Sequence, residues 1–403
     1  MSFVEVIFAI ILGVSSGIIT GLVPGIHVNL LSVIMISFSA VLLSITSPIT
    51  LAIYIISLAI THSFLDSIPS IYLGAPDAGQ ELNVLPGHRL LHNGEGHNAI
   101  TYTVIGSLGC LLLGILLFPI FIVSMGILAP ILKGSIGYIL SGIMIFMIGK
   151  DKGKRIKSFL AFMLAGVLGL IVLTAIPNLE QPLFPMLSGL FGFSILIMSL
   201  AQNSSIPEQD FSKPLTISKK NATKAITAAS GVGFIAAFLP GFGSSQAAIV
   251  ATNVVGDIGD EGFLSLVGGI NTANMLISIG TAYVLDKARN GAIVTVKTLL
   301  GGVGLEEMIL FLGVALVVGG IATILKLKIS KIFANVIVKV NYKMVVYSIL
   351  GFIILLTFYF DGVIGLTILF TATAIGLVSS IWGIGKNHLM GCLILPVILF
   401  FVL

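Results

Sequence analysis

Two short segments combine proline and glycine with polar residues, and they are the strongest chemical signal in this sequence. Residues 17–25 read Gly-Ile-Ile-Thr-Gly-Leu-Val-Pro-Gly and residues 233–241 read Gly-Phe-Ile-Ala-Ala-Phe-Leu-Pro-Gly, so four identities recur at a separation of 216 positions. Proline removes a backbone hydrogen-bond donor, and glycine tolerates left-handed backbone conformations. Each Pro-Gly pair is therefore expected to end one half-helix and to let another begin.

The start of a half-helix can bind an anion. It exposes several unpaired N–H groups and carries a partial positive charge, and polar side chains in its first turn complete the binding shell. The residues predicted to bind an anion in this way, with the two prolines acting as hinges, are Pro24, Gly25, His27, Asn29, Pro240, Gly241, Gly243, Ser244 and Ser245. The competing interpretation is a proline kink that only shapes helix packing. A packing kink would explain a single Pro-Gly motif well. It explains less well two such motifs that have similar neighbouring residues and are each followed by polar residues.

Other polar residues inside apolar segments are further candidates. Asp66 follows an apolar run, and ionisable groups at membrane depth tend to be functional. It is predicted to bind a coupling ion, Na⁺ or H⁺, unless it is an acid at a solvated helix end. Asn271 and Asn274 lie at helical spacing with Thr272 and Ser278. This polar face either lines a substrate path or joins helices by hydrogen bonds.

Metal and cofactor chemistry is not indicated. His88, His92, Glu95 and His97 are close in sequence, but their spacing fits no standard zinc site, and a solvated loop is the favoured interpretation. Both cysteines lie in apolar runs, and no nucleophile–base pair emerges. The sequence therefore predicts no metal, no cofactor and no enzyme activity.

The elements that must position these residues are membrane helices. Hydrophobic residues make up 57% of the 403 residues and charged residues only 9%, and the mean hydropathy is +1.16. We predict an all-α, polytopic integral membrane protein of the cytoplasmic membrane, with about 11–13 transmembrane segments of roughly 20 apolar residues each. The expected spans are 3–22, 27–45, 49–66, 100–126, 130–149, 157–176, 183–201, 223–238, 244–283 (broken), 303–325, 344–360, 363–381 and 387–403.

Loop charges predict the orientation of these spans. Lysine and arginine concentrate in residues 150–157, 213–224 and 326–343, which the positive-inside rule places in the cytoplasm. Working back from the first segment puts residues 86–98 on that side, and working back from the third puts residues 286–300 outside. Residues 329–343 also have the pattern of an amphipathic helix lying at the membrane interface.

The repeated motif and the loop charges together predict two halves. The first repeat is expected over residues 1–200, a cytoplasmic linker over 201–222, and the second repeat over 223–403. A weaker similarity of residues 62–91 to residues 271–300 supports this division. Because the charges orient the halves oppositely, we predict an inverted repeat with broken or re-entrant helices, which is common among secondary transporters.

These motifs resemble those of a known family, the TctA-type large membrane subunit of tripartite tricarboxylate transporters, in a short, archaeal-like form. Residues 21–27 and 238–244 resemble the paired Pro-Gly segments of that family. Residues 70–78 resemble its small-residue loop, residues 85–95 the Gly-Glu turn that follows, and residues 268–274 its Asn/Ala-rich segment.

The resemblance implies uptake of a carboxylate by symport with an ion, together with a small membrane subunit and an extracytoplasmic binding protein. His27 and Asn29 stand where small residues or proline are more usual, so we expect a small organic anion without specifying a tricarboxylate. The alternative is a flippase-like carrier of a polyprenyl-phosphate or another anionic lipid. No nucleic-acid partner is expected, and assembly into a homo-oligomer is left open.

Overall fold

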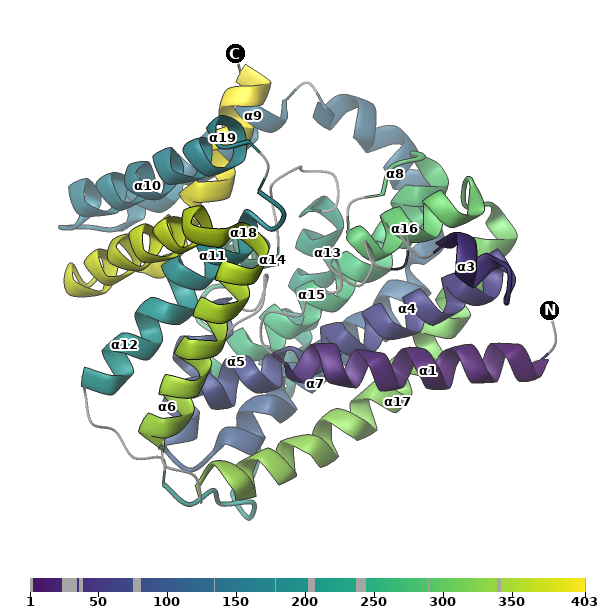
Figure 1. The fold of residues 1–403 in the computed structure, drawn as a ribbon, viewed down its shortest axis with the longest axis horizontal. Helices are drawn as coiled ribbons and strands as arrows, with labels where there is room; N and C mark the ends of the chain where they lie inside the picture. The colour runs from purple at the N-terminus through teal and green to yellow at the C-terminus, as the bar shows by residue number, and fades with distance from the viewer. Residues whose placement is uncertain are drawn as a thin grey trace.

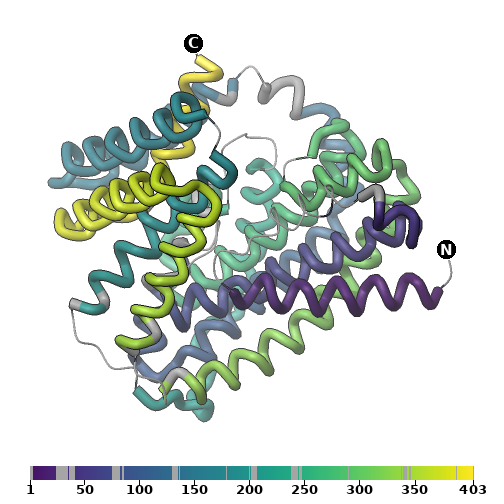
Figure 2. Tube along the Cα trace, viewed as in Figure 1, coloured from purple at the N-terminus to yellow at the C-terminus, as the bar shows by residue number. Residues whose placement is uncertain are grey.

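The fold was examined in a computed structural model of the chain. It describes residues 3–23, 35, 39–74, 81–133, 135–177, 179–201, 207–236, 244–288, 290–338 and 342–402. Figure 2 traces the chain through these segments. The predicted site residues at positions 24, 25, 27 and 29 and at 240, 241 and 243 lie outside them.

The described part of the chain is helical (Figure 1). The main helices are α1 (Phe3–Leu22), α3 (Ser39–Leu43), α4 (Pro48–Leu65), α5 (Ser67–Leu73), α6 (Val84–His92), α7 (Gly96–Leu116), α8 (Phe118–Lys133), α9 (Ile136–Lys150), α10 (Arg155–Leu170), α11 (Leu183–Leu187), α12 (Ser194–Ala201), α13 (Lys219–Ala236), α14 (Ser244–Val255), α15 (Gly259–Val284), α16 (Gly291–Leu300), α17 (Leu305–Ile337), α18 (Tyr342–Ile381) and α19 (Gly391–Val402). The short helical turns are η1 (Glu81–Asn83), η2 (Ile171–Ala175), η3 (Ser188–Phe193) and η4 (Lys386–Met390).

Many of these helices suit a membrane. Within the described residues, seven are long and apolar enough to cross a bilayer, and five more apolar helices have 10–17 residues. Large apolar side chains such as Phe8, Val123 and Leu355 are exposed. A surface of this kind is stable when lipid covers it. The all-α, polytopic membrane architecture is therefore confirmed.

Small residues let α1 pack closely along α4. A Cβ atom at Gly13 would lie 2.6 Å from the Cβ of Ser57, and one at Gly17 would lie 2.6 Å from the Cβ of Thr61. Contacts thus advance in the same direction along both helices, so α1 and α4 are parallel.

The pair formed by α13 and α15 has the same arrangement. A Cβ atom at Gly233 would lie 2.9 Å from the Cβ of Ala273, and one at Gly269 would lie 3.0 Å from the Cβ of Ala229. These helices are therefore also parallel, and a glycine of the first helix again faces the second.

The α7 helix runs parallel to α15. The Ser265 hydroxyl donates to the Tyr102 carbonyl at 2.8 Å, and the Ser107 hydroxyl donates to the Gly268 carbonyl at 3.1 Å. Further along both helices, a Cβ atom at Gly114 would meet the side chain of Leu276.

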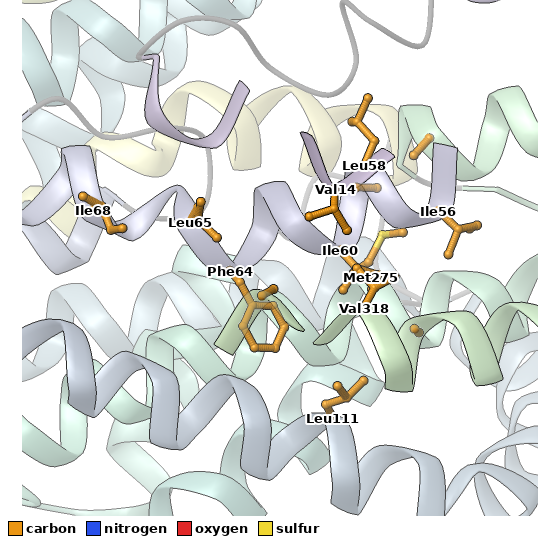
Figure 3. Packing of buried hydrophobic residues seen from close by; sticks show 14 of the residues in the cluster. Val14, Ile56, Leu58, Ile60, Phe64, Leu65, Ile68, Leu111, Met275 and Val318 are labelled. Carbon is orange, nitrogen blue, oxygen red and sulfur yellow. The ribbon is translucent and has the colours of Figure 1, made fainter. Parts of the chain in front are cut away.

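The long helix α17 runs opposite to α7 and parallel to α4 and α5. Gly319 of α17 contacts Leu111 of α7, and Ser330 contacts His97, so the contacts advance along α17 as they go back along α7. Tyr72, at the end of α5, also bonds to Ser330. It follows that α4 and α15 run in opposite directions. Figure 3 shows the apolar core between these helices, including Leu111.

The α13 and α14 helices form a helical hairpin. The Asn221 side chain near the start of α13 donates to the Ile258 carbonyl, 3.4 Å away, just beyond the end of α14. The chain therefore enters and leaves this hairpin on one side. The twelve described residues of α14 extend about 18 Å, which is less than the roughly 30 Å hydrocarbon core. The break predicted inside residues 244–283 is confirmed, since α14 ends at Val255 and α15 begins at Gly259.

Cross-packing joins the remaining helices on the side of the molecule opposite α1 (Figure 1). A Cβ atom at Gly169 of α10 would clash with the Cys392 carbonyl of α19. In the same way, a Cβ atom at Gly376 of α18 would clash with the Leu190 carbonyl of η3. Each contact joins a helix from the first 200 residues to one from the last 180.

The third basic segment needs the largest correction. The predicted span at 303–325 and the interfacial helix at 329–343 are wrong as separate elements, because α17 is one helix of 33 residues. No proline interrupts it, so nothing removes a hydrogen bond where the lysines begin. As a result Lys326 lies inside the helix and is 1% exposed.

Other boundaries also differ. The predicted span 100–126 is divided at Leu117, because Pro119 opens α8 and has no N–H to continue α7. The two spans predicted on either side of residue 362 form one kinked helix, α18, in which Gly362 has φ +58°. The α13 helix begins at Lys219, inside the segment predicted as a linker.

Candidate functional site

A buried polar cluster lies where α4, α15 and α17 meet. The Asp66 side chain is 3% exposed, and the Lys326 side chain is among those that are almost fully buried. The Asn271 amide donates to Asp66 Oδ2 at 2.9 Å and to the Ser63 carbonyl at 3.2 Å. The Asp66 carboxylate acts electrostatically on the Lys326 ammonium group. An acid, an amide and a lysine from three helices thus share one buried site.

The local sequence places Asp66 at a break between two helices. The α4 helix ends at Leu65, and the Asp66 N–H still donates to the His62 carbonyl at 2.9 Å. Pro69 stands in the first turn of α5 and has no N–H for the Leu65 carbonyl. Asp66 is therefore held at an interrupted helix junction, where its side chain meets α15.

The charges in this cluster compensate one another. An isolated charge in an apolar interior is costly, and a buried pair persists only with good hydrogen bonding. Here Asp66 and Lys326 have opposite charges, and Asn271 satisfies one carboxylate oxygen. Ionisable residues inside membrane proteins are retained mainly where they serve a function.

Asp66 and Asn271 were predicted to lie at separate sites, and Lys326 was not predicted as a site residue. The structure brings the first two into direct contact, and it buries the lysine that we had assigned to a cytoplasmic loop. The sequence did contain a signal for the burial of Lys326. Ala322 and Ser330, four residues to either side of Lys326, are small residues on the same helix face, and both are fully buried.

A second polar layer lies one helical turn from Lys326. The Tyr72 hydroxyl donates to the Ser330 carbonyl at 3.1 Å, and His97 Nδ1 lies 3.1 Å from Ser330 Oγ. One turn before Asp66 on α4, His62 Nδ1 lies 3.1 Å from Thr20 Oγ1, and this contact joins α4 to α1. His62 is thus a hydrogen-bonded interior histidine.

Part of the predicted anion site can also be located. Ser244 is the first described residue of α14, and it is 4% exposed. Ser245 follows in the same turn, although its side chain is outside the described set. Asn274 lies one turn beyond Asn271 on α15, and its backbone nitrogen is beside Gly233 of α13. The asparagine face of α15 therefore extends from the Asp66 cluster toward the α13–α14 hairpin.

Another buried lysine has different surroundings. The Lys386 ammonium donates to Ser194 Oγ at 2.6 Å, to the Leu190 carbonyl at 3.3 Å and to the Gly376 carbonyl at 3.4 Å. These acceptors are all neutral, and burial lowers the pKa of Lys386 to about 7. This lysine joins η4 and α18 to η3.

The histidine-rich segment is not the solvated loop that we expected. It forms α6, in which His88 is 9% exposed. Burial, with a smaller contribution from His92, lowers the pKa of His88 to about 4. The described residues contain no group of three or more acidic, histidine or cysteine side chains able to hold a metal ion.

The polar segment near residue 213 packs against the α6–α7 turn. Lys213 Nζ donates to the Asn93 carbonyl at 2.8 Å and lies 3.1 Å from a Glu95 carboxylate oxygen. Arg89 and Asp260 form a two-bond ion pair nearby. Two segments predicted to lie in the cytoplasm are thus on one side of the molecule.

Comparison with known proteins identifies the family. Residues 7–391 match the Tripartite tricarboxylate transporter TctA family. A protein of Methanocaldococcus jannaschii named "Uncharacterized protein MJ1079" is 29% identical over 401 residues, which is 98% of each chain. No solved structure matches this chain. Because the family match extends over residues 7–391 of the 403, and so over both the α13–α14 hairpin and the Asp66 cluster, this chain belongs to the TctA family of tripartite tricarboxylate transporters.

Proposed function

We propose that this chain is a secondary active transporter of a small organic anion, a carboxylate, with its binding site at the tips of two re-entrant half-helices. Membership of the family makes it a component of a membrane transporter and not an enzyme. The observation that carries the finer proposal is the short helix α14. Its first described residue is the buried Ser244, at the inner end of a hairpin whose two ends lie on the same side.

Such a helix start suits a carboxylate. Its unpaired N–H groups and partial positive charge attract an anion without burying a full positive charge in the membrane. Ser244, the first described residue of α14, adds a hydroxyl donor. In this proposal Ser245, Gly241 and Gly243 complete this half of the site, and Gly25, His27 and Asn29 form the other half.

Helix packing supports the proposal of two related halves. The contact of Gly17 with Thr61 corresponds to that of Gly233 with Ala273, since the partners are shifted by 216 and 212 positions. The pair α1 and α4 therefore has a counterpart in α13 and α15. Since α4 and α15 run in opposite directions, an inverted repeat accounts for the relation.

The cross-packed helices support the same division. The contact of Gly169 with Cys392 corresponds to that of Gly376 with Leu190, at shifts of 207 and 202 positions. In each case a helix of one half packs on a helix of the other. We propose that residues 1–200 and 223–403 are the two repeats and that they exchange these helices. Alternating access would then arise from movement of one half against the other.

The coupling ion and the partners complete the proposal. Asp66, joined to Asn271, is proposed as the ion-coupling residue, and Asn274 as part of the substrate path. Members of this family work with a small membrane subunit and a binding protein. We propose the same partners for this chain, in the cytoplasmic membrane.

Transport by the purified chain in proteoliposomes tests this function. We expect at least one radiolabelled mono-, di- or tricarboxylate to accumulate when an ion gradient is applied. One hydrogen bond to a charged group contributes about 1.5–3 kcal/mol, so Ser244→Ala should weaken apparent affinity roughly ten- to a hundredfold.

Ser15→Ala is the matched control, because that exposed hydroxyl bonds only within its own helix, to the Ile11 carbonyl at 2.8 Å. Equal affinities for the two variants would refute the α14 site. Movement of a fluorescent polyprenyl-phosphate between leaflets, with no carboxylate uptake, would support the lipid carrier instead.

A further inference from the structure

We infer that Lys326 is the proton carrier of the coupling site, that its ammonium group takes the place of a coupling Na⁺ beside Asp66, and that transport is therefore driven by H⁺. This inference rests on the proposed function, because it assumes that the chain couples transport to an ion gradient. It also specifies which ion that is.

The first support is the position of the lysine. Ala322, Lys326 and Ser330 form one face of α17, and each is at most 1% exposed. That face packs on α4, α5 and α7, as the Gly319 and Ser330 contacts show. The Lys326 side chain is consequently enclosed by protein, although lysine normally reaches toward water with its charged end.

The second support is the charge of the surroundings. The titratable groups that face this stretch of α17 from the elements packed on it are Asp66 at the end of α4, Tyr72 on α5 and His97 on α7. His62 lies one turn before Asp66, and its ring contacts Thr20 of α1. Within the described part of the chain, Asp66 is the acid that acts on Lys326. The histidines are held by Thr20 and Ser330, and Tyr72 also bonds to Ser330. Lys331 acts on His97.

The third support is the cost of a second cation at the same carboxylate. Two unit positive charges about 4 Å apart repel by about 4 kcal/mol at an effective dielectric constant of 20. That cost weakens Na⁺ binding roughly a thousandfold while Lys326 is charged. The charged ammonium group thus excludes Na⁺ from Asp66. When Lys326 loses its proton, both its repulsion of Na⁺ and its attraction to the Asp66 carboxylate disappear.

The cluster also joins the two proposed halves. Asp66 belongs to the first half, and Asn271 and Lys326 belong to the second. By the shift of 212 positions between α4 and α15, the counterpart of Asp66 is Ser278, whose hydroxyl donates to Asn274 in its own helix. The position that corresponds to Asp66 therefore carries no charge, and the described residues form one such cluster between the halves, which predicts one proton for each transport cycle.

The proton step is simple. In the charged state the Lys326 ammonium pairs with the Asp66 carboxylate and holds the halves together. One N–H bond of the ammonium breaks, the proton passes to water on the receiving side, and the electron pair stays on nitrogen as a neutral amine. The halves then separate at this point, and a proton from the opposite side restores the pair.

Lys326→Arg tests this step without removing the charge. Arginine keeps the ion pair but does not release its proton in proteins. In proteoliposomes with the membrane potential clamped at zero, a difference of one pH unit, acid outside, should drive up to about tenfold accumulation of [¹⁴C]citrate or [¹⁴C]succinate by the native chain. We expect Lys326→Arg to show no accumulation, and Lys328→Arg, at an exposed position of the same helix, to match the native chain.

A second measurement does not depend on substrate. The thermal unfolding midpoint of the native chain in detergent should be the same in 100 mM NaCl and 100 mM KCl, whereas Lys326→Ser should be stabilised by NaCl alone. Saturable stabilisation of the native chain by Na⁺, or accumulation that needs Na⁺, would overturn the inference. Full pH-driven accumulation by Lys326→Arg would also overturn it. The same holds if pH-driven accumulation were lost in Lys386→Arg and kept in Lys326→Arg. If the native chain moved no carboxylate at all, the proposed function would fail, and the unfolding midpoints would still decide whether Lys326 excludes Na⁺.

Discussion

Replacing Asp66 by asparagine leaves the Lys326 ammonium buried beside an amide instead of a carboxylate. Both side chains are almost fully enclosed, so solvent cannot replace the missing charge. Removing one member of a buried ion pair costs about 3–5 kcal/mol, whereas replacing both members by neutral groups of similar size is often close to neutral. We therefore expect Asp66→Asn and Lys326→Met each to destabilise the protein by about 3 kcal/mol or more.

The variant that carries both Asp66→Asn and Lys326→Met gives the coupling free energy between the two residues. Its destabilisation should be smaller than the sum of the two single effects by at least about 3 kcal/mol. The free energy of unfolding is measured by denaturant titration in detergent micelles with far-UV circular dichroism. The same cycle on Arg89→Met and Asp260→Asn is the control, because those side chains are 55% and 36% exposed. Exposed pairs contribute about 1 kcal/mol or less. If the effects at Asp66 and Lys326 simply add, the two groups do not form a pair.

Two further predictions concern orientation and packing. In a membrane, Asn93→Cys and Lys287→Cys should react with an impermeant maleimide from opposite sides, since both positions are exposed and the two native cysteines are buried; labelling of both from one side would contradict the proposed inverted topology. Gly169→Ala should destabilise the protein by about 1–3 kcal/mol, because the added methyl group clashes with the Cys392 carbonyl. Gly142→Ala, which meets nothing within 4 Å, should be close to neutral in the same unfolding measurement, and equal stabilities would refute the α10–α19 contact.

Composition and local backbone chemistry determined much of this protein in advance. With 57% hydrophobic and 9% charged residues, only a membrane can cover its surface, and only helices satisfy the backbone there without a closed sheet. The break inside residues 244–283 was also predictable, because glycine readily takes the left-handed conformation that ends a helix. The α14 helix ends at Val255 and α15 begins at Gly259, and Gly256 between them has φ +77°.

Only the tertiary structure decided what surrounds the charged residues. Asp66 and Asn271 are 205 positions apart, and no local rule predicts their hydrogen bond. Lys326 lies in a basic segment that looks like a loop, and it is buried because Gly319, Ala322 and Ser330 let α17 approach its neighbours closely. A lysine near other lysines normally faces water. Whether it does so here depends on the side chains of other helices, so the burial of Lys326 and its electrostatic interaction with Asp66 arise only when the helices are packed together.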